Sequence, residues 1–303
     1  MQSRRHLPVS THEYFGRSIP VDIESPWGES DGMNRWTLKL LKKLPWSLTS
    51  KNPRFGYVNA WVGVFPSWAA AMSAIPPGNP VGYDQEAAKT MFTTYPTTLT
   101  RPSDYAVLLH LRNIAKPGMR VVDVGGSIGT AYYLALKYYP MPEPFEWNVF
   151  DVPAVLEAGR QVALREGEKS KALRFISKCG DAGNCDIFFS SGALQLIEDT
   201  LPGMLQQLPQ LPEHILINRI PVWDRDAIVT LNDMGFSLAP YNVFNRKEWI
   251  SSVEKLGYKL VDQWACLESN FFSIRFHPRS RIRAYSGFYF VRATESRIQT
   301  NTP

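Results

Sequence analysis

The sequence predicts an α/β fold with a doubly wound, mostly parallel sheet that ends in an antiparallel hairpin. A mainly irregular or helical N-terminal region is expected before it. Three observations lead to this prediction. Segments with strand and helix periodicity alternate from residue 103 onward, a glycine-rich turn joins the first strand to its helix, and two strand-like segments close the chain. Such alternation is typical of a parallel sheet with helices on both faces.

The alternating part begins with a helix that Ser103 can cap and that Pro117-Gly118 ends. The expected strands cover residues 119–124, 147–150, 173–177, 187–190 and 215–220. The expected helices cover residues 103–115, 130–139, 154–166 and 201–208. Together these segments supply the parallel strands of the predicted sheet and the helices that cover it.

The last part of the alternating region has its own signals. Asn245 and Glu248 form a variant of the capping box, at the start of a helix that Gly257 ends. Residues 258–265 and 286–291 suit an antiparallel hairpin with a long, basic connection. Residues 294–303 are polar and are expected to form a disordered tail.

Residues 1–100 differ from the rest of the chain in composition and in residue pattern. They are rich in Trp, Pro and Gly and show no strand–helix alternation, although residues 37–44 suit a short amphipathic helix. Residues 1–60 hold nine Lys and Arg against five Asp and Glu, within a chain of net charge +5. A basic segment of this kind is either a solvated face or a surface for an anionic partner, and both readings stay open.

Composition excludes several classes of protein. Three cysteines, Cys179, Cys185 and Cys266, form no Cys-x-x-Cys pair and no disulfide framework, so a reducing, cytoplasmic location is expected. The five histidines lack metal-ligand spacing, and no metal is expected. No stretch approaches ~18 uninterrupted apolar residues, so membrane insertion is not expected.

The turn after the first parallel strand is the main site motif. It contains Asp123, Gly125, Gly126, Ser127 and Gly129. Paired glycines let the backbone turn sharply and approach a ligand, and the amides at the start of the next helix favour an anionic group. The spacing does not fit Gly-x-Gly-x-x-Gly, which weakens a nicotinamide dinucleotide. Asp123 suits a cationic amine, which the amino acid end of S-adenosylmethionine carries.

Further polar residues follow the next strands. Asp151, with Val152 after it, stands where a carboxylate can accept hydrogen bonds from both ribose hydroxyls. The alternative for Asp151 is a helix N-cap. Asp181 after the third strand is a candidate for the adenine amino group, and Ser190 and Ser191 end the fourth strand at the same edge.

These motifs resemble class I, Rossmann-like methyltransferases that use S-adenosylmethionine. Five further segments are similar to a family of bacterial methyltransferases defined mainly by sequence, whose members are often encoded among genes for surface-polysaccharide synthesis. They are residues 63–68, 82–84, 191–195, 218–221 and 286–290. The resemblance spans roughly residues 60–292. Together with the change of pattern near Ser103, it predicts a substrate or lid region at 1–100, an S-adenosylmethionine-binding domain at 101–293 and the tail at 294–303.

The catalytic residues are less defined than the cofactor motif. Many plant-type O-methyltransferases have a histidine just after the fourth strand, and this sequence has none there. Candidates for handling the acceptor proton are Tyr83 and Asp84 from the N-terminal region, Glu198 and Asp199 after the fourth strand, and His214 before the fifth. Tyr83 is favoured, and His214 is the least expected because it lies at the wrong end of its strand. Arg219 is a candidate for binding an anionic or sugar acceptor, and an ion pair inside the fold is the alternative.

The predicted function is S-adenosylmethionine-dependent methylation, with a small-molecule or sugar-type acceptor methylated on oxygen. One alternative is a different reaction in the same cofactor pocket. A second is a basic RNA-binding or RNA-methylating protein, against which the catalytic half shows no lysine-rich stripe with interleaved aromatics. A third is a non-catalytic partner subunit. Nucleic acid is therefore not the expected partner, and a homo-oligomer is compatible with the sequence.

Overall fold

The structure is a computed structural model that describes residues 12–14, 17–19, 60–271 and 281–293. The chain divides into two compact units, residues 1–44 and 45–303. In the first unit, β1 (His12–Tyr14) and β2 (Arg17–Ile19) pair as an antiparallel hairpin. The helix expected at residues 37–44 and the tail at 294–303 lie outside the described residues.

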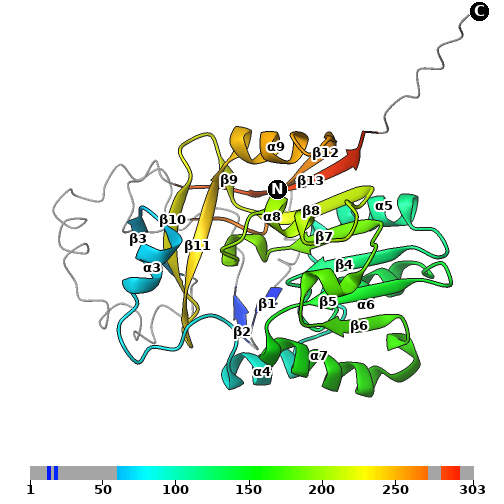
Figure 1. The fold of residues 1–303 in the computed structure, drawn as a ribbon. Coiled ribbons are helices and arrows are strands. Elements are labelled where there is room, and N and C mark those ends of the chain that lie inside the picture. Colours follow the sequence, from blue (N-terminus) through cyan, green and yellow to red (C-terminus); the bar gives the residue numbers. More distant parts are fainter. Residues whose placement is uncertain (1–11, 15–16, 20–59, 272–280, 294–303) are drawn as a thin grey trace, which may run out of the picture. The chain divides into compact units, whose positions relative to one another are not determined.

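A seven-stranded sheet is the centre of the second unit (Figure 1). Its strands are β4 (Arg120–Val124), β5 (Glu146–Phe150), β6 (Leu173–Ile176), β7 (Ile187–Ser191), β8 (His214–Ile220), β12 (Tyr258–Cys266) and β13 (Tyr285–Arg292). The order is β12-β13-β8-β7-β4-β5-β6; β13 pairs antiparallel with both β12 and β8, and all other neighbouring strands pair in parallel. From β6 to β8 this is the 3-2-1-4-5 order of a doubly wound sheet. The predicted fold class is confirmed.

Helices cover both faces of this sheet. The buried side chains of α5 (Asp104–Ile114), α6 (Thr130–Tyr138) and α7 (Pro153–Glu166) share one core with Val121 and Phe189. Those of α8 (Leu201–Gln206) and α9 (Arg246–Glu254) share the other with Val122 and Phe188. Successive residues of a strand point to opposite faces, so the apolar runs of β4 and β7 supply both cores. Short 3₁₀ turns η1 (Gly167–Ser170), η2 (Cys179–Ala182) and η3 (Leu194–Leu196) connect the elements.

A second, four-stranded sheet was not predicted. It has the order β3-β10-β11-β9, from β3 (Ala60–Phe65), β10 (Ile228–Asp233), β11 (Leu238–Asn245) and β9 (Val222–Trp223). In it, Ala60 pairs with Asp233, so the N-terminal region contributes a strand in addition to the helices α3 (Trp68–Ser73) and α4 (Glu86–Thr93). Pairing between such distant segments leaves no local sequence signal, which explains why it was missed.

The boundaries of the predicted segments agree with the structure within a few residues. One detail was wrong: Ser103 occupies the N-cap position of α5, but its hydroxyl bonds to Glu268 and Asn218 and not to the helix backbone. The cap at Asn245 is confirmed, since its Oδ1 accepts from Glu248 N at 3.0 Å. In the part of the chain that the structure describes, no helix is both long and apolar enough to cross a membrane.

Candidate functional site

β4 and β7 are neighbours in the sheet, and the order of the strands reverses between them. The strands that follow β4 in sequence extend toward one edge of the sheet, and those that follow β7 extend toward the other. The crevice outside the carboxyl ends of such strands is where doubly wound sheets bind ligands. The loop from Gly125 to Gly129 leaves β4 at this point and enters α6. The sheet therefore brings the predicted glycine motif to its expected place.

Backbone conformation explains the glycines of this loop. Gly125 has φ 67° and Gly129 has φ 85°, both in the left-handed region that favours glycine. A Cβ on Gly125 would also overlap the Cβ of Ala193, so this loop packs directly on the segment after β7. Ser127 has φ 57°, which is uncommon for a residue with a side chain and points to a functional turn.

Asp123 lies beneath this loop and is almost fully buried. Its Oδ2 accepts a hydrogen bond from Trp147 Nε1 at 2.9 Å, while its buried Oδ1 has no hydrogen-bond partner among the described residues. A Cβ on Gly126 would stand 2.5 Å from the Asp123 carboxyl carbon, so glycine leaves room for this carboxylate. Burial raises the pKa of Asp123 to about 7, although the hydrogen bond from Trp147 lowers this pKa.

Asp151 connects the end of β5 to the same loop. Its Oδ2 accepts from Ser127 N at 2.9 Å and its Oδ1 accepts from Val152 N at 2.8 Å. Each carboxylate oxygen has a second lone pair that can accept from a ligand hydroxyl. Burial raises the pKa of Asp151 to about 6, and the two backbone bonds act in the opposite direction.

The proposed cap role of Asp151 is filled by another residue. The N-cap position of α7 is Val152, and the amide of Ala154 in its first turn donates to Asp84 Oδ1 at 2.9 Å. Asp84 comes from the N-terminal region, where Gly82 N donates to Leu238 O at 2.8 Å. The segment that the resemblance singled out around Tyr83 is therefore held between β11 and the start of α7.

The two serines that end β7 have different surroundings. The hydroxyl of Ser190 donates to Val124 O at 2.8 Å inside the sheet, and the residue is fully buried. The hydroxyl of Ser191, like that of Ser127, is buried without a hydrogen-bond partner in the described chain. Buried polar atoms of folded proteins are normally paired. The unpaired atoms of Ser127, Ser191 and Asp123 thus fit a polar ligand at this crevice.

Asp181 lies in η2, after β6, with its side chain exposed. Its Oδ2 accepts from Lys178 N at 3.2 Å, which stabilises the turn and leaves the other oxygen available. Its contact with an adenine group stays a prediction.

Tyr83 lies close to Asp151 and is partly buried. Its ring packs against Phe92 and Phe236, with centroids 5.9 and 5.8 Å away. Burial first, and then the negative charge of Asp151, raise the pKa of Tyr83 to about 12. At neutral pH the hydroxyl is therefore protonated and can donate a hydrogen bond, but it is a poor base.

Arg219 lies near the carboxyl end of β8 with φ 56°, a strained conformation for arginine. Its guanidinium forms an ion pair with Asp104, and only 14% of its side chain is exposed. Asn218 Nδ2 also donates to Asp104 Oδ1, at 3.3 Å. The ion-pair alternative thus describes this structure, and an additional role in acceptor binding stays a prediction.

A polar cluster around this pair includes residues that the sequence did not point to. Ser103 Oγ bonds to Glu268 Oε1, and Glu268 Oε2 is buried with no partner among the described residues. Trp264 Nε1 donates to Asn218 Oδ1 at 2.9 Å. No local pattern connects α5, β8 and the end of β12, so only the folded chain brings these side chains together.

Asp199 is exposed at the start of α8. Its Oδ1 accepts from Thr200 N and its Oδ2 from Gln207 Nε2, both at 2.7 Å. Asp199 also lines a cavity of about 310 Å³ with Leu201, Phe244 and Trp249. Its part in catalysis stays a prediction. Over the described ranges, no three His, Cys, Asp or Glu side chains converge as metal ligands would.

No family model matches the chain, and no curated protein matches it. Several solved structures are similar to it. The 1,6-didemethyltoxoflavin-N1-methyltransferase of Burkholderia thailandensis, with 1,6-didemethyltoxoflavin and S-adenosylhomocysteine bound, shares 16% identity over 69% of this chain and 83% of its own, with a TM-score of 0.43. The CcbJ methyltransferase of Streptomyces caelestis shares 12% over 70% and 98%, with a TM-score of 0.46.

A third similar structure is the glycopeptide N-methyltransferase MtfA complexed with S-adenosylmethionine. It shares 8% identity over 66% of this chain and 99% of its own, with a TM-score of 0.44. These TM-scores are low, so the fold assignment rests on the strand order of the seven-stranded sheet.

Proposed function

We propose that this chain is a methyltransferase that binds S-adenosylmethionine over the β4–α6 loop and methylates an oxygen of a small-molecule or sugar-type acceptor. One observation carries the proposal. The buried Asp123 carboxylate has an unpaired oxygen directly beneath a glycine turn, and Asp151 lies at the end of the neighbouring strand. A ligand with a cationic amine and a diol would satisfy both carboxylates, and S-adenosylmethionine carries both groups.

The residues present fit this cofactor. Asp123 would receive the ammonium group, the amides that begin α6 would receive the carboxylate, and Asp151 would accept from the ribose hydroxyls. The hydroxyls of Ser127 and Ser191 are further donors at the same edge. Asp181 is the proposed partner of the adenine amino group.

Bound S-adenosylmethionine would supply a methyl group from its sulfonium, and the sulfur would leave as a neutral thioether. The chain's own contribution is then to align the acceptor oxygen and to exclude water. Tyr83 would donate a hydrogen bond near Asp151 and would not remove the acceptor proton, because its pKa is near 12. Asp199 remains the proposed proton acceptor, and its two oxygens accept hydrogen bonds from Thr200 N and Gln207 Nε2.

Calorimetry with the purified chain tests the proposal. We expect S-adenosylhomocysteine and S-adenosylmethionine to bind more tightly than NAD. Transfer of radiolabelled methyl to candidate sugars and small hydroxylated compounds then tests the reaction. Tighter binding of NAD would overturn the cofactor assignment. Cofactor binding with no methyl transfer to any acceptor, and a different product, would favour another reaction in the same pocket.

A further inference from the structure

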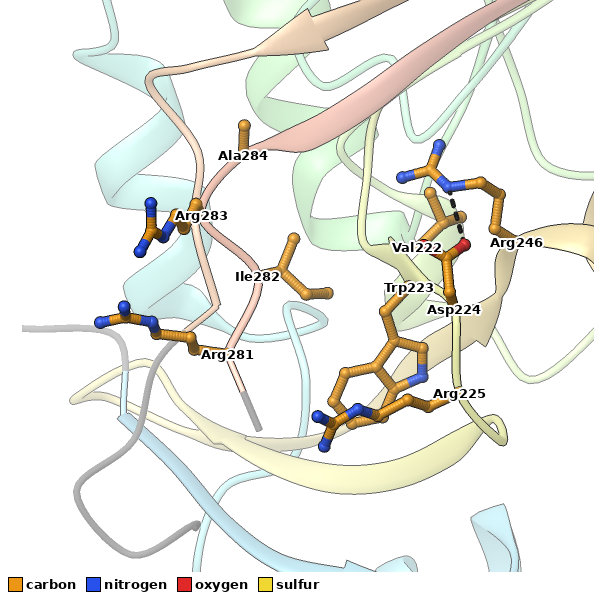
Figure 2. Close-up of a pocket in the computed structure, with 9 residues that line it drawn as sticks. All are labelled: Val222, Trp223, Asp224, Arg225, Arg246, Arg281, Ile282, Arg283 and Ala284. Atoms are coloured by element: carbon orange, nitrogen blue, oxygen red, sulfur yellow. Dashed lines mark ion pairs between the residues drawn. The ribbon is translucent and has the colours of Figure 1, made fainter. Parts of the chain in front are cut away.

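A second cavity, of about 390 Å³, lies beside the segment that follows β8 (Figure 2). One wall is formed by Trp223, Asp224 and Arg225, together with Arg246 at the start of α9. The other wall is residues 281–284, which lead into β13. Residues 222–225 directly follow β8, so the cavity lies beyond the carboxyl end of this strand, and doubly wound sheets bind ligands along that edge.

The lining of this cavity is strongly basic. It includes four arginines, Arg225, Arg246, Arg281 and Arg283, against the single carboxylate of Asp224, a net charge of +3. Arg225, Arg281 and Arg283 have no carboxylate within ion-pair distance in the described parts of the chain. Like charges gathered around one concavity create a positive potential that attracts anions.

The one ion pair in the cavity is weak. Arg246 Nε lies 3.4 Å from Asp224 Oδ1, and the Asp224 side chain is 87% exposed. Exposed pairs of this kind contribute little, because water screens both charges. Arg246 Nη1 also donates to Ser286 Oγ at 3.2 Å, which fixes the guanidinium at the wall. An incoming dianion can therefore replace the Asp224 carboxylate at a guanidinium that is already in place.

The four arginines divide into two pairs. In Figure 2, Arg246 and Arg225 lie with Trp223 on one wall, and Ile282 points toward Trp223 from the other. The Arg225 guanidinium is 5.9 Å from the centre of the Trp223 ring, over its face. Arg281 and Arg283 extend from the opposite side of the segment that carries Ile282. We call Arg225 and Arg246 the inner pair, because they lie at the two ends of the wall that carries Trp223, and Arg281 and Arg283 the outer pair, which adds charge.

We propose, on the basis of the proposed function, that this cavity binds a phosphate group carried by the methyl acceptor. Guanidinium groups recognise phosphate oxygens through paired, charge-assisted hydrogen bonds, and arginine is the side chain suited to that geometry. The remaining volume has an apolar wall formed by Trp223 and Ile282, against which the rest of the acceptor packs. The acceptor class is therefore a phosphorylated small molecule.

The experiment measures binding of pyrophosphate to the full chain by calorimetry, at low and at high salt, with S-adenosylhomocysteine titrated in parallel. Three proteins are compared: wild type, Arg225→Gln combined with Arg246→Gln, and Arg160→Gln. Arg160 is an exposed arginine on α7 and serves as the control for the loss of one surface charge. Arg225→Gln alone covers the case in which loss of the Arg246–Ser286 bond unfolds the double variant.

We expect pyrophosphate to bind wild type and Arg160→Gln equally and to bind the double variant at least ~10-fold more weakly. Affinity for S-adenosylhomocysteine is expected to be the same in all three. Equal pyrophosphate binding by wild type and the double variant, or sulfate binding as tight as pyrophosphate, would overturn the proposal. The proposal would also be overturned if wild type bound a single-stranded RNA but not pyrophosphate, and the double variant lost the RNA binding. If wild type binds pyrophosphate but not S-adenosylhomocysteine, the result would instead contradict the proposed function and still support the anion site.

Discussion

The carboxylate of Asp151 accepts a hydrogen bond from the backbone N–H of Ser127 at 2.9 Å. This bond ties the carboxyl end of β5 to the turn after β4, at the one non-glycine residue of that turn with positive φ. Asp151 therefore has a structural task as well as its proposed contact with the ribose. A carboxylate that shapes the loop and also binds the ligand couples the order of the loop to the affinity of the cofactor.

Replacing Asp151 with asparagine tests this double role. The side chain keeps its shape, but its amide NH₂ cannot accept from a backbone N–H, so one of the two bonds is lost. We expect cofactor affinity to fall by about 10- to 1,000-fold, for a loss of about 1.5–4 kcal/mol, with a smaller loss of stability. Calorimetry and thermal melting of the same variant check this. Wild-type affinity in Asp151→Asn would eliminate the ribose contact.

Asp123 makes the stability of the ligand-free chain depend on pH. Its folded-state pKa of about 7 lies above the ordinary 3.8, so the folded chain binds more protons than the unfolded chain between these values. This contribution to the free energy of unfolding is therefore greatest below about pH 4 and falls by up to about 4 kcal/mol as pH rises to about 7.

Replacing Asp123 with asparagine removes that dependence. We expect the variant to be more stable than wild type at pH 8, with no gain at pH 4, and to bind S-adenosylhomocysteine more weakly because the ammonium loses its partner. Urea unfolding at both pH values measures the first effect. Glu168→Gln, an exposed carboxylate in η1, is the control. The same stability difference at pH 4 and pH 8 would contradict the role assigned to burial of this carboxylate.

Asp84 is predicted to stabilise the start of α7. Its Oδ1 accepts from Ala154 N, which otherwise lacks an intrahelical partner in the first turn. We expect Asp84→Ala to lower the free energy of unfolding by about 1 kcal/mol and Asp84→Asn to change it little, since asparagine caps nearly as well. Denaturant unfolding compares the two. If both variants match wild type, the bond contributes nothing to stability.

Arg219 and Asp104 are expected to be coupled. Removing one partner leaves a buried, unpaired charge, so Arg219→Met should cost about 3–5 kcal/mol of stability. Adding Asp104→Asn should recover much of this lost stability, because no charge is then left unpaired. The asparagine has the shape of the aspartate, and its carbonyl oxygen can still accept from Arg101 N. A double-mutant cycle of unfolding free energies measures the coupling. Additive losses would show that the two side chains act separately.

Acceptor kinetics of the same double variant separate the two roles of Arg219. If its only task is the ion pair, the rescued protein should have wild-type acceptor KM. A raised KM with unchanged cofactor affinity would favour direct contact of Arg219 with the acceptor.

The sequence by itself determined the seven-stranded fold and the cofactor motif, because both depend on local patterns. Strand and helix periodicity placed β4 to β8 and their helices, and β–α turns placed Asp123, Gly125 and Asp151 at strand ends that a parallel sheet brings to one edge. Tertiary structure alone decided which distant side chains meet there. The pairing of β3 with β10, the Asp84 cap on α7 and the Arg219–Asp104 ion pair each join segments far apart in the chain. Such contacts depend on how the elements pack in three dimensions, and residue periodicity does not record that packing.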